Sequence, residues 1–372
     1  MKTAGYLVLA ALLGACATPR ASAPIARDTM IYSAEVAQAR QEQLLLNIVR
    51  LRYNDPVSFI EVQTLTTEDF SGRSGSLASA FALDGSPFTE VLSGEVGAQR
   101  SVSPTAVYNV LRGSAYAQQL LHPVAPESIF LLSQSGWSVE RLMLCCVARI
   151  GDLENARAAA GPTPDVLPVN TVFREFARRM RRLQESGDLL VQVINDEEDA
   201  AARIVITWHA GSPDGDALAG MFREHRAATE FSEEGGLYLA ELSTRSSRKG
   251  DSPVRGRSLL GMLSALSHTV DVPPVHAGLV VQTSGGNGSG APSACAPVGI
   301  WNEVAGGFFG VSWSSERPTS AAVAVPYRGV WFYVDDTCRS AKSTLDLIGH
   351  LYAIQAGLSD SGSRDTLLLI GG

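Results

Sequence analysis

Two adjacent carboxylates, Asp335 and Asp336, have the best placement for chemistry in this sequence. They end an aromatic segment typical of a strand and precede a segment typical of a helix, so they could bind a cation or act as acid and base. Neighbouring side chains of a strand point to opposite faces, which keeps such a pair from converging on one substrate. The simpler interpretation is that Asp336 or Thr337 caps the following helix.

The sequence contains no other motif that carries a mechanism. It has neither H-E-x-x-H nor G-x-S-x-G, and its Gly-rich segment at 284–290 lacks the P-loop lysine and the dinucleotide-binding spacing. The six histidines have no metal-ligand spacing: His122, His209, His225, His268, His276 and His350. We therefore predict no metal site, no cofactor and no readable catalytic activity, and a protein without enzymatic activity is favoured over an enzyme.

The first residues predict export and lipid attachment. Lys2 precedes an apolar run at 6–13, which is the pattern of a secretory signal and is shorter than the roughly 20 residues of a membrane-spanning helix. The segment LGAC at 13–16 resembles the lipobox of bacterial lipoproteins. The resemblance implies cleavage before Cys16, a diacylglycerol on its sulfur and a third acyl chain, such as palmitate, on the new amino terminus. An ordinary signal peptide with an incidental Cys16 is the alternative.

The residues after Cys16 bear on location. Two or more acyl chains anchor a protein stably in a membrane. In enterobacterial lipoprotein sorting, an Asp directly after the cysteine favours the inner membrane. This chain has Ala17 at that position, so the resemblance implies the outer membrane, facing the periplasm. The inner membrane and the cell surface stay as alternatives. Residues 17–29 are small, polar and proline-containing, which predicts a tether.

Four further cysteines allow three disulfide pairings in an exported chain. Cys145 and Cys146 are adjacent in an apolar segment typical of a helix, where a vicinal disulfide would be strained, so we expect two buried free thiols. Cys295 and Cys338 flank the aromatic strands near the C-terminus and are the favoured pair.

Composition limits the class of partner. The formal net charge is -8, and hydrophobic and charged residues make up 45% and 18% of the chain. These fractions are those of a globular protein with a sizeable core. An acidic protein is a poor candidate for nonspecific nucleic-acid binding, so we expect no nucleic-acid partner.

Hydrophobic periodicity predicts mainly helices and a β hairpin in the first half. A helix at 34–53 ends at Asn54-Asp55-Pro56, because the residue before a proline avoids the helical region. Residues 57–66 and 88–103 are typical of strands, with a Gly- and Ser-rich loop at 71–87. Residues 104–155 are predicted to be helical, with Ser138 as an N-cap.

The second half mixes helices with hairpins. The helix at 170–187 buries one face made of Val172, Phe173, Phe176, Met180 and Leu183, and its arginines are read as a solvated face. Strands at 188–194 and 202–210 form a hairpin, and two strands turn at 327–329. A last helix at 337–357 and a last strand at 365–370 follow.

These elements predict an α+β fold, with a helix-rich N-terminal region followed by a mixed α/β C-terminal region with antiparallel hairpins. The clearest break is the segment GPTPDVLP at 161–168. The expected organisation is a signal peptide at 1–15, a lipidated tether at 16–30, a mostly helical domain with a β hairpin at 31–160, and an α+β domain at 169–372.

Four segments together resemble an uncharacterised proteobacterial lipoprotein family. They are LLLNIVRLRYNDPVSF at 44–59, the stretch at 104–137, RSLLGMLSALSHTVDVPP at 257–274 and YRGVWFYVDD at 327–336, and the first and last are the most specific. The resemblance implies a lipid anchor and a place in the cell envelope. It brings no activity, substrate or catalytic residue.

Three functions follow as hypotheses. The favoured one is a lipid-anchored cell-envelope protein that acts as a binding or adaptor module for an envelope protein or a cell-wall component. The second is an envelope hydrolase with a site around Asp335 and Asp336. The third is a carrier of a small apolar ligand, which would need an enclosed apolar cavity.

Overall fold

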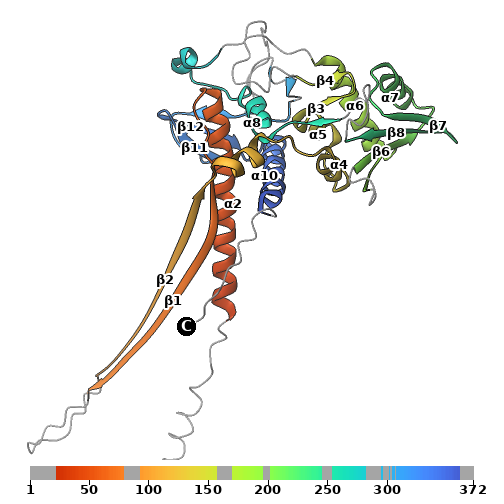
Figure 1. Ribbon diagram of the computed structural model, residues 1–372. Coiled ribbons are helices and arrows are strands. Elements are labelled where there is room, and N and C mark those ends of the chain that lie inside the picture. The colour runs from red at the N-terminus through yellow and green to blue at the C-terminus, as the bar shows by residue number, and fades with distance from the viewer. Residues whose placement is uncertain are drawn as a thin grey trace, which may run out of the picture. The chain divides into compact units, whose positions relative to one another are not determined.

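A computed structural model describes residues 22–78, 93–156, 170–195, 202–244, 254–281, 295, 301, 304–305 and 307–360 (Figure 1). The fold is α+β, as predicted, with helices and small antiparallel sheets. The chain divides into two compact units, residues 58–113 and the remainder. The predicted boundary at 161–168 lies outside the described residues, and the helices on its two sides, α5 (Val139–Cys146) and α6 (Thr171–Ser186), pack against each other.

The first helix, α2 (Ser22–Arg52), begins within residues 16–30, the segment predicted as a tether, and earlier than the helix predicted at 34–53. Pro24 does not prevent this, because it lies in the first turn, where a backbone N–H would have no intrahelical acceptor. The second half of the helix buries Leu45, Ile48 and Val49 completely. This face packs against α8 (Leu259–Ser267), β11 (Ala321–Tyr327) and α10 (Arg339–Asp360).

Short helices follow between residues 113 and 146: α3 (Gly113–Tyr116), the π-helix η1 (Ala117–Leu121), α4 (Pro126–Gln134) and α5. The Ser138 hydroxyl accepts from the Arg141 N–H, which confirms the predicted cap of α5. The predicted helical stretch at 104–155 is wrong at both ends. Residues 104–110 belong to β2 (Ser93–Val110), and β3 (Val147–Ile150) and β4 (Leu153–Glu154) follow α5, because β3 pairs with both β4 and β9 (Arg255–Gly256).

A four-stranded sheet has the order β5-β6-β8-β7. Its strands are β5 (Leu190–Asn195), β6 (Ala202–His209), β7 (Glu230–Glu234) and β8 (Leu237–Ser243), and the predicted β5–β6 hairpin is confirmed. Trp208 stacks on Phe222 of α7 (Pro213–Glu224), and Phe222 meets Phe176 of α6. The burial of Val172 was wrongly predicted, since it is 47% exposed.

Four arginines of α6, Arg178, Arg179, Arg181 and Arg182, lie in ion pairs, which agrees with a solvated face. Arg179 and Arg182 both reach Asp214, and Arg182 donates to both of its carboxylate oxygens at 2.8 Å. Arg178 pairs with Glu140 and Arg181 with Glu185.

A three-stranded sheet has the order β10-β12-β11, with β10 (Ser312–Ser314) and β12 (Val330–Asp335) beside β11. The predicted turn between the last two strands is confirmed. The 3-10 helix η3 (Pro274–Leu279) precedes this sheet in the chain, and α10 follows it. A disulfide joins Cys295 to Cys338, the pairing favoured from the sequence.

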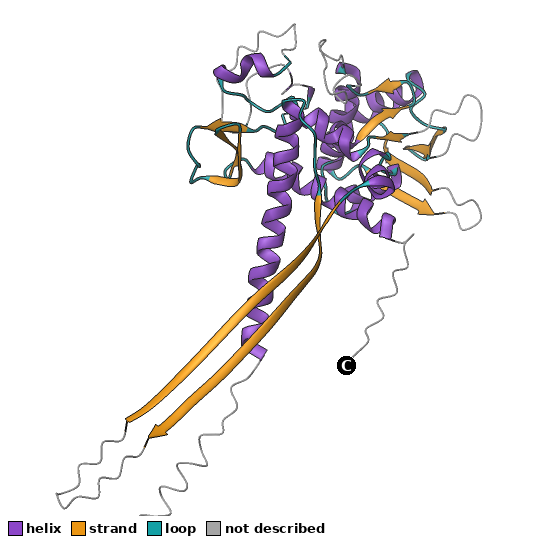
Figure 2. Cartoon of the chain, turned by 60° about the vertical axis from the view of Figure 1, so that its left-hand side comes forward, coloured by secondary structure: helices purple, strands orange, loops and turns teal. Residues whose placement is uncertain are grey.

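The second unit is a hairpin of β1 (Ile60–Ala78) and β2, drawn as two long antiparallel ribbons in Figure 2. Residues 71–78 are strand, so the predicted loop begins too early. Gly and Ser weaken a strand, but pairing with residues 93–100 gives these residues backbone partners.

Among the described residues, no helix combines the length and the apolar character needed to cross a membrane. The predicted signal peptide, Cys16 and the strand at 365–370 lie outside the described residues.

Candidate functional site

Asp335, the first carboxylate of the predicted pair, makes hydrogen bonds that stabilise the local fold. It is 8% exposed at the end of β12. Its carboxylate accepts hydrogen bonds from the Ser320 hydroxyl at 2.7 Å and from the Thr337 N–H and hydroxyl at 2.9 and 2.6 Å. These bonds, the one from Ser320 first, lower the pKa of Asp335. The ionised carboxylate therefore holds the turn that leads into α10.

Asp336 points elsewhere. Its carboxylate is 69% exposed and forms an ion pair with Lys342 at 2.7 Å. Asp336 and Thr337 do not cap α10 as predicted, because the helix begins at Arg339 and Cys338 occupies the capping position. The two carboxylates thus have separate partners, as expected for adjacent strand residues.

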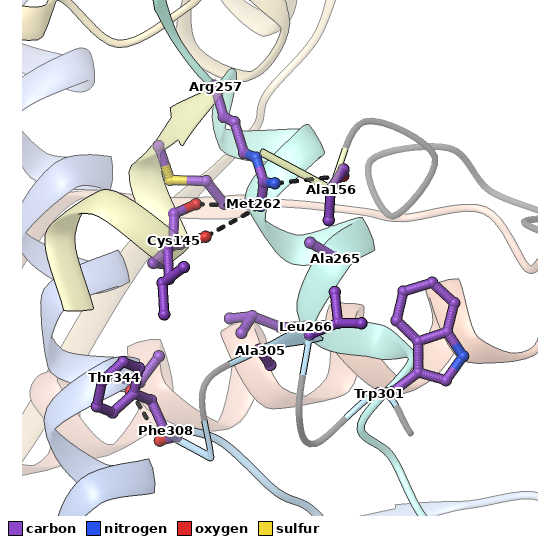
Figure 3. A pocket seen from close by; sticks show the side chains of 12 residues that line it. Cys145, Ala156, Arg257, Met262, Ala265, Leu266, Trp301, Ala305, Phe308 and Thr344 are labelled. Carbon is purple, nitrogen blue, oxygen red and sulfur yellow. Dashed lines mark hydrogen bonds between the residues drawn. The ribbon is translucent and has the colours of Figure 1, made fainter. Parts of the chain in front are cut away.

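The two free cysteines, Cys145 and Cys146, lie in the core beside Arg257. The Arg257 guanidinium donates to the backbone carbonyls of Leu144, Cys145 and Ala156, as the dashed lines in Figure 3 show. Burial raises the pKa of Cys146. Figure 3 also shows the adjoining pocket, whose volume of about 20 Å³ is room for about one water molecule. This pocket is too small for an apolar ligand.

A denser cluster of polar and aromatic side chains lies where α2 ends, and we call it the Tyr53 site: Tyr53, Asp55, His276, Tyr327 and Arg328. It draws on the end of α2, the helix η3 and the turn between β11 and β12.

The end of α2 has a defined geometry. Asn54 has φ 59°, and its N–H donates to the Leu51 carbonyl, while the Asp55 N–H donates to the Arg50 carbonyl. This is the Schellman arrangement, in which one left-handed residue closes the last carbonyls of a helix. The predicted stop at 54–56 is confirmed.

The β11–β12 turn supplies the opposite side of the Tyr53 site. Tyr327 pairs with Val330, and the two residues between them, Arg328 and Gly329, have φ 48° and 83°. Positive φ at both central positions defines a type I′ turn, which favours Asn, Asp or Gly at the first. Arg328 therefore keeps a strained backbone, and strained residues concentrate where function requires them.

Asp55 joins these two elements. Its carboxylate accepts from the Tyr327 hydroxyl and, at 2.7 Å, from the Arg328 guanidinium. The hydrogen bond from Tyr327, followed by that from Arg328, lowers the pKa of Asp55. Asp55 is thus ionised at neutral pH, and the Arg328 guanidinium compensates its negative charge, so Asp55 has little capacity to act as a base.

Tyr53 is the centre of the aromatic part. Its hydroxyl forms a hydrogen bond of 2.8 Å with Nδ1 of His276, and its ring meets those of Tyr327 and Phe332 at centroid distances of 5.6 and 6.0 Å. The Arg328 guanidinium lies 5.1 Å from the Tyr53 ring centre, within cation–π range. Burial raises the pKa of Tyr53 to about 12, so its phenol is neutral at physiological pH.

A cleft of about 420 Å³ adjoins the Tyr53 site. It is lined by Arg52, Tyr53, Asn54, His268 and residues 278–281. This volume lies in the range of small-molecule and side-chain binding pockets. Arg52 donates to the carbonyls of Val270 and Val281, which holds the rim of the cleft to the end of α2.

The Tyr53 site is equipped for recognition. It offers aromatic rings, an arginine and a histidine, its member Tyr53 lines the adjoining cleft, and its carboxylate is already paired. Among the described residues, no group of three or more His, Cys, Asp or Glu side chains could hold a metal ion.

Sequence reasoning missed this site because its residues come from three distant segments. It interpreted residues 53–55 only as a helix stop and His276 only as a scattered histidine. One indication was present: the two most specific segments of the family resemblance, YNDP at 53–56 and YRG at 327–329, are the ones that Asp55 joins.

Comparisons with family models, with curated proteins and with solved structures find no match for this chain.

Proposed function

We propose that this protein is a lipid-anchored bacterial cell-envelope protein that acts as a binding or adaptor module, with the Tyr53 site as its binding surface. The anchor is the acylated Cys16, the location is the outer membrane facing the periplasm, and the partner is an envelope protein or a cell-wall component. The observation that carries the binding role is that Tyr53 both stacks with the Arg328 guanidinium and lines the adjoining cleft of about 420 Å³.

The chemistry of the Tyr53 site supports binding over catalysis. Asp55 is neutralised by Arg328, and the Tyr53 phenol is neutral, so neither group is poised to take a proton at neutral pH. The remaining groups, an arginine face and aromatic edges, are those enriched at the energetic centres of protein interfaces.

The two alternative functions have less support. A hydrolase at Asp335 and Asp336 would need converging carboxylates, whereas Asp335 is occupied by Ser320 and Thr337 and Asp336 by Lys342. A carrier of an apolar ligand would need an enclosed apolar cavity, and the apolar pocket beside Arg257 has room only for a water molecule.

The proposed function is tested by crosslinking in cells, followed by capture of the intact lipoprotein. Wild type is compared with Cys16→Ser, which removes the anchor, and with Arg328→Gln, which removes the cation from the Tyr53 site. The matched control is Arg317→Gln, because Arg317 is an exposed arginine that stacks on Trp331 of the same sheet at 5.3 Å.

We expect a defined envelope partner with wild type and Arg317→Gln, and at least a tenfold loss of that partner with Arg328→Gln and with Cys16→Ser. Equal capture by Arg328→Gln and wild type would exclude the Tyr53 site as the binding surface. Normal membrane partition of Cys16→Ser, with no acyl mass on the N-terminal peptide of wild type, would refute the lipid anchor.

A further inference from the structure

The β1–β2 hairpin has more paired residues than the other strand pairs among the described residues. Its register runs from Ile60 opposite Val110 to Ala78 opposite Ser93. At about 3.4 Å per residue, such strands extend roughly 60 Å. Within the described part of the chain this sheet has two strands, so each strand uses one edge and presents the other. An isolated two-stranded sheet is marginally stable in water, which creates a need for further strands.

Two features that protect a sheet edge, a register shift and a proline, lie at one end of this hairpin. A register shift lies between Val62 and Thr64, and Pro104, which lacks a backbone N–H, lies opposite Thr67. From the pair Glu68–Ser103 to the pair Ala78–Ser93, the register is continuous and neither strand contains proline. Natural edges of this length are normally blocked by proline, bulges or charged side chains, and of these the distal part contains only charged residues. Because proline and bulges are the devices that remove or displace backbone N–H groups, the backbone of the distal part remains available for strand addition.

We propose that this distal part is an interface between copies of the chain, in which the free edge of β2 in one copy pairs antiparallel with the free edge of β1 in another. The proposal does not depend on the binding role of the Tyr53 site. Because the two edges differ, the contact is head-to-tail and is repeated from copy to copy, as a ring or an open array.

Charge favours the pairing of unlike edges. The distal part of β1 contains Glu68, Asp69 and Arg73, so two β1 edges pairing with each other about this acidic pair would bring like charges together. If β2 meets β1 of the next copy in the register seen within the hairpin, each charged residue lies opposite an uncharged one. Those pairs are Glu68–Ser103, Asp69–Val102, Arg73–Ala98, Ser71–Arg100 and Ser76–Glu95.

A second copy is the occupant that this hairpin specifies, because the same chain supplies both edges at matching length. β1 has 19 residues and β2 has 18, so one copy offers a complete complement to the next. Backbone pairing of this kind gives affinity without requiring a specific side-chain sequence.

The test is site-directed crosslinking of the full lipoprotein in its membrane. Two differently tagged chains are co-expressed, one with Ser74→Cys and one with Gly97→Cys, which are directly opposite positions in the hairpin register. A short bismaleimide is then added. We expect a mixed dimer at least tenfold above the level from either variant alone. The unmodified chain is the control, because its free thiols, Cys145 and Cys146, are buried.

A second variant tests the interface without relying on a crosslink at one pair of positions. Residues 71–100 are replaced by Asn-Gly, which joins the paired residues Phe70 and Ser101 by a two-residue turn. We expect wild type to be oligomeric by light scattering in detergent and the shortened chain to be monomeric with unchanged near-UV circular dichroism. A monomeric wild type, or equal masses for the two chains, would overturn the interface. Crosslinks from one variant alone would overturn the head-to-tail arrangement.

Discussion

The β11–β12 and β1–β2 hairpins differ in how their backbones find partners. Strand β12 lies between β10 and β11, so both of its edges are paired by strands of only three to seven residues. The strands of the β1–β2 hairpin are far longer, yet among the described residues each has one paired edge. The comparison shows that longer strands do not by themselves give a hairpin partners on both edges. The β11–β12 hairpin is instead stabilised by a third strand, a short turn and side chains anchored in the core.

Three contacts secure the β11–β12 hairpin to the rest of its unit. Phe332 is fully buried and lies edge-on to Tyr53, the disulfide at Cys338 fixes the start of α10, and Asp55 holds the turn through Tyr327 and Arg328. Removing each of these contacts should lower the free energy of unfolding of the chain. The expected losses decrease in that order.

Phe332→Ala should have the largest effect. Phe332 is 0% exposed, and truncation of a buried phenylalanine costs about 3–5 kcal/mol, from lost burial and the cavity left behind. Urea unfolding of the purified chain measures the change, with Phe332→Leu as the smaller truncation, which should cost less. A loss below about 1 kcal/mol would mean that β12 is not a core strand.

Loss of the Cys295–Cys338 disulfide should come next. The two cysteines are 43 residues apart, for which the chain-entropy model gives a ceiling of about 4 kcal/mol, and disulfides typically contribute about 2–4 kcal/mol. The double variant Cys295→Ser, Cys338→Ser should lower the midpoint of urea unfolding, and a reductant should then have no further effect. An unchanged midpoint would show that this crosslink does not constrain the unfolded chain.

Asp55→Asn should cost about 1–2 kcal/mol, because the Tyr327 hydroxyl and the Arg328 guanidinium lose a charged acceptor. The matched control is Asp336→Asn. It breaks an ion pair whose carboxylate is 69% exposed, and it should cost less than about 0.5 kcal/mol. Equal losses for the two variants would remove Asp55 from its role as an anchor.

The smallest effect is the pH dependence of the contribution that Asp55 makes to the free energy of unfolding. Asp55 has a lowered pKa in the folded chain, so its contribution to stability is fully present above the ordinary aspartate pKa of about 4. It is lost as the pH falls through the lowered folded value. The difference in unfolding free energy between wild type and Asp55→Asn should be constant from pH 7 to pH 5 and shrink below pH 4. A difference that grows on acidification would contradict a lowered pKa.

Local sequence patterns predicted much of the fold. Ser138 caps α5 because a hydroxyl beside an apolar run finds the nearest free N–H, and the turn at Arg328-Gly329 follows from two strand segments separated by two residues. The errors came from competition between distant segments. Residues 147–150 read as helix but pair with Arg255 and Gly256, and residues 71–78 read as loop but pair across the hairpin.

The candidate site was less predictable than the fold. Asp335 and Asp336 stood out because adjacent carboxylates are visible in a sequence, yet one holds a turn and the other faces solvent. The Tyr53 site was not predictable because Tyr53 and Asp55 lie more than two hundred residues before its other members, and none belongs to a catalytic motif.

The sequence by itself determined the α+β class, the lipobox-like segment at Cys16, the end of α2 and the cap of α5, since the last two depend on residues within a turn or two of one another. Only the tertiary structure decided that Asp55 meets Tyr327 and Arg328, and that two long strands lie side by side over 18 residues. The physical reason is that hydrogen bonds and charge pairs act over a few ångströms in space, and the packing of α2 against β11 brings those atoms together.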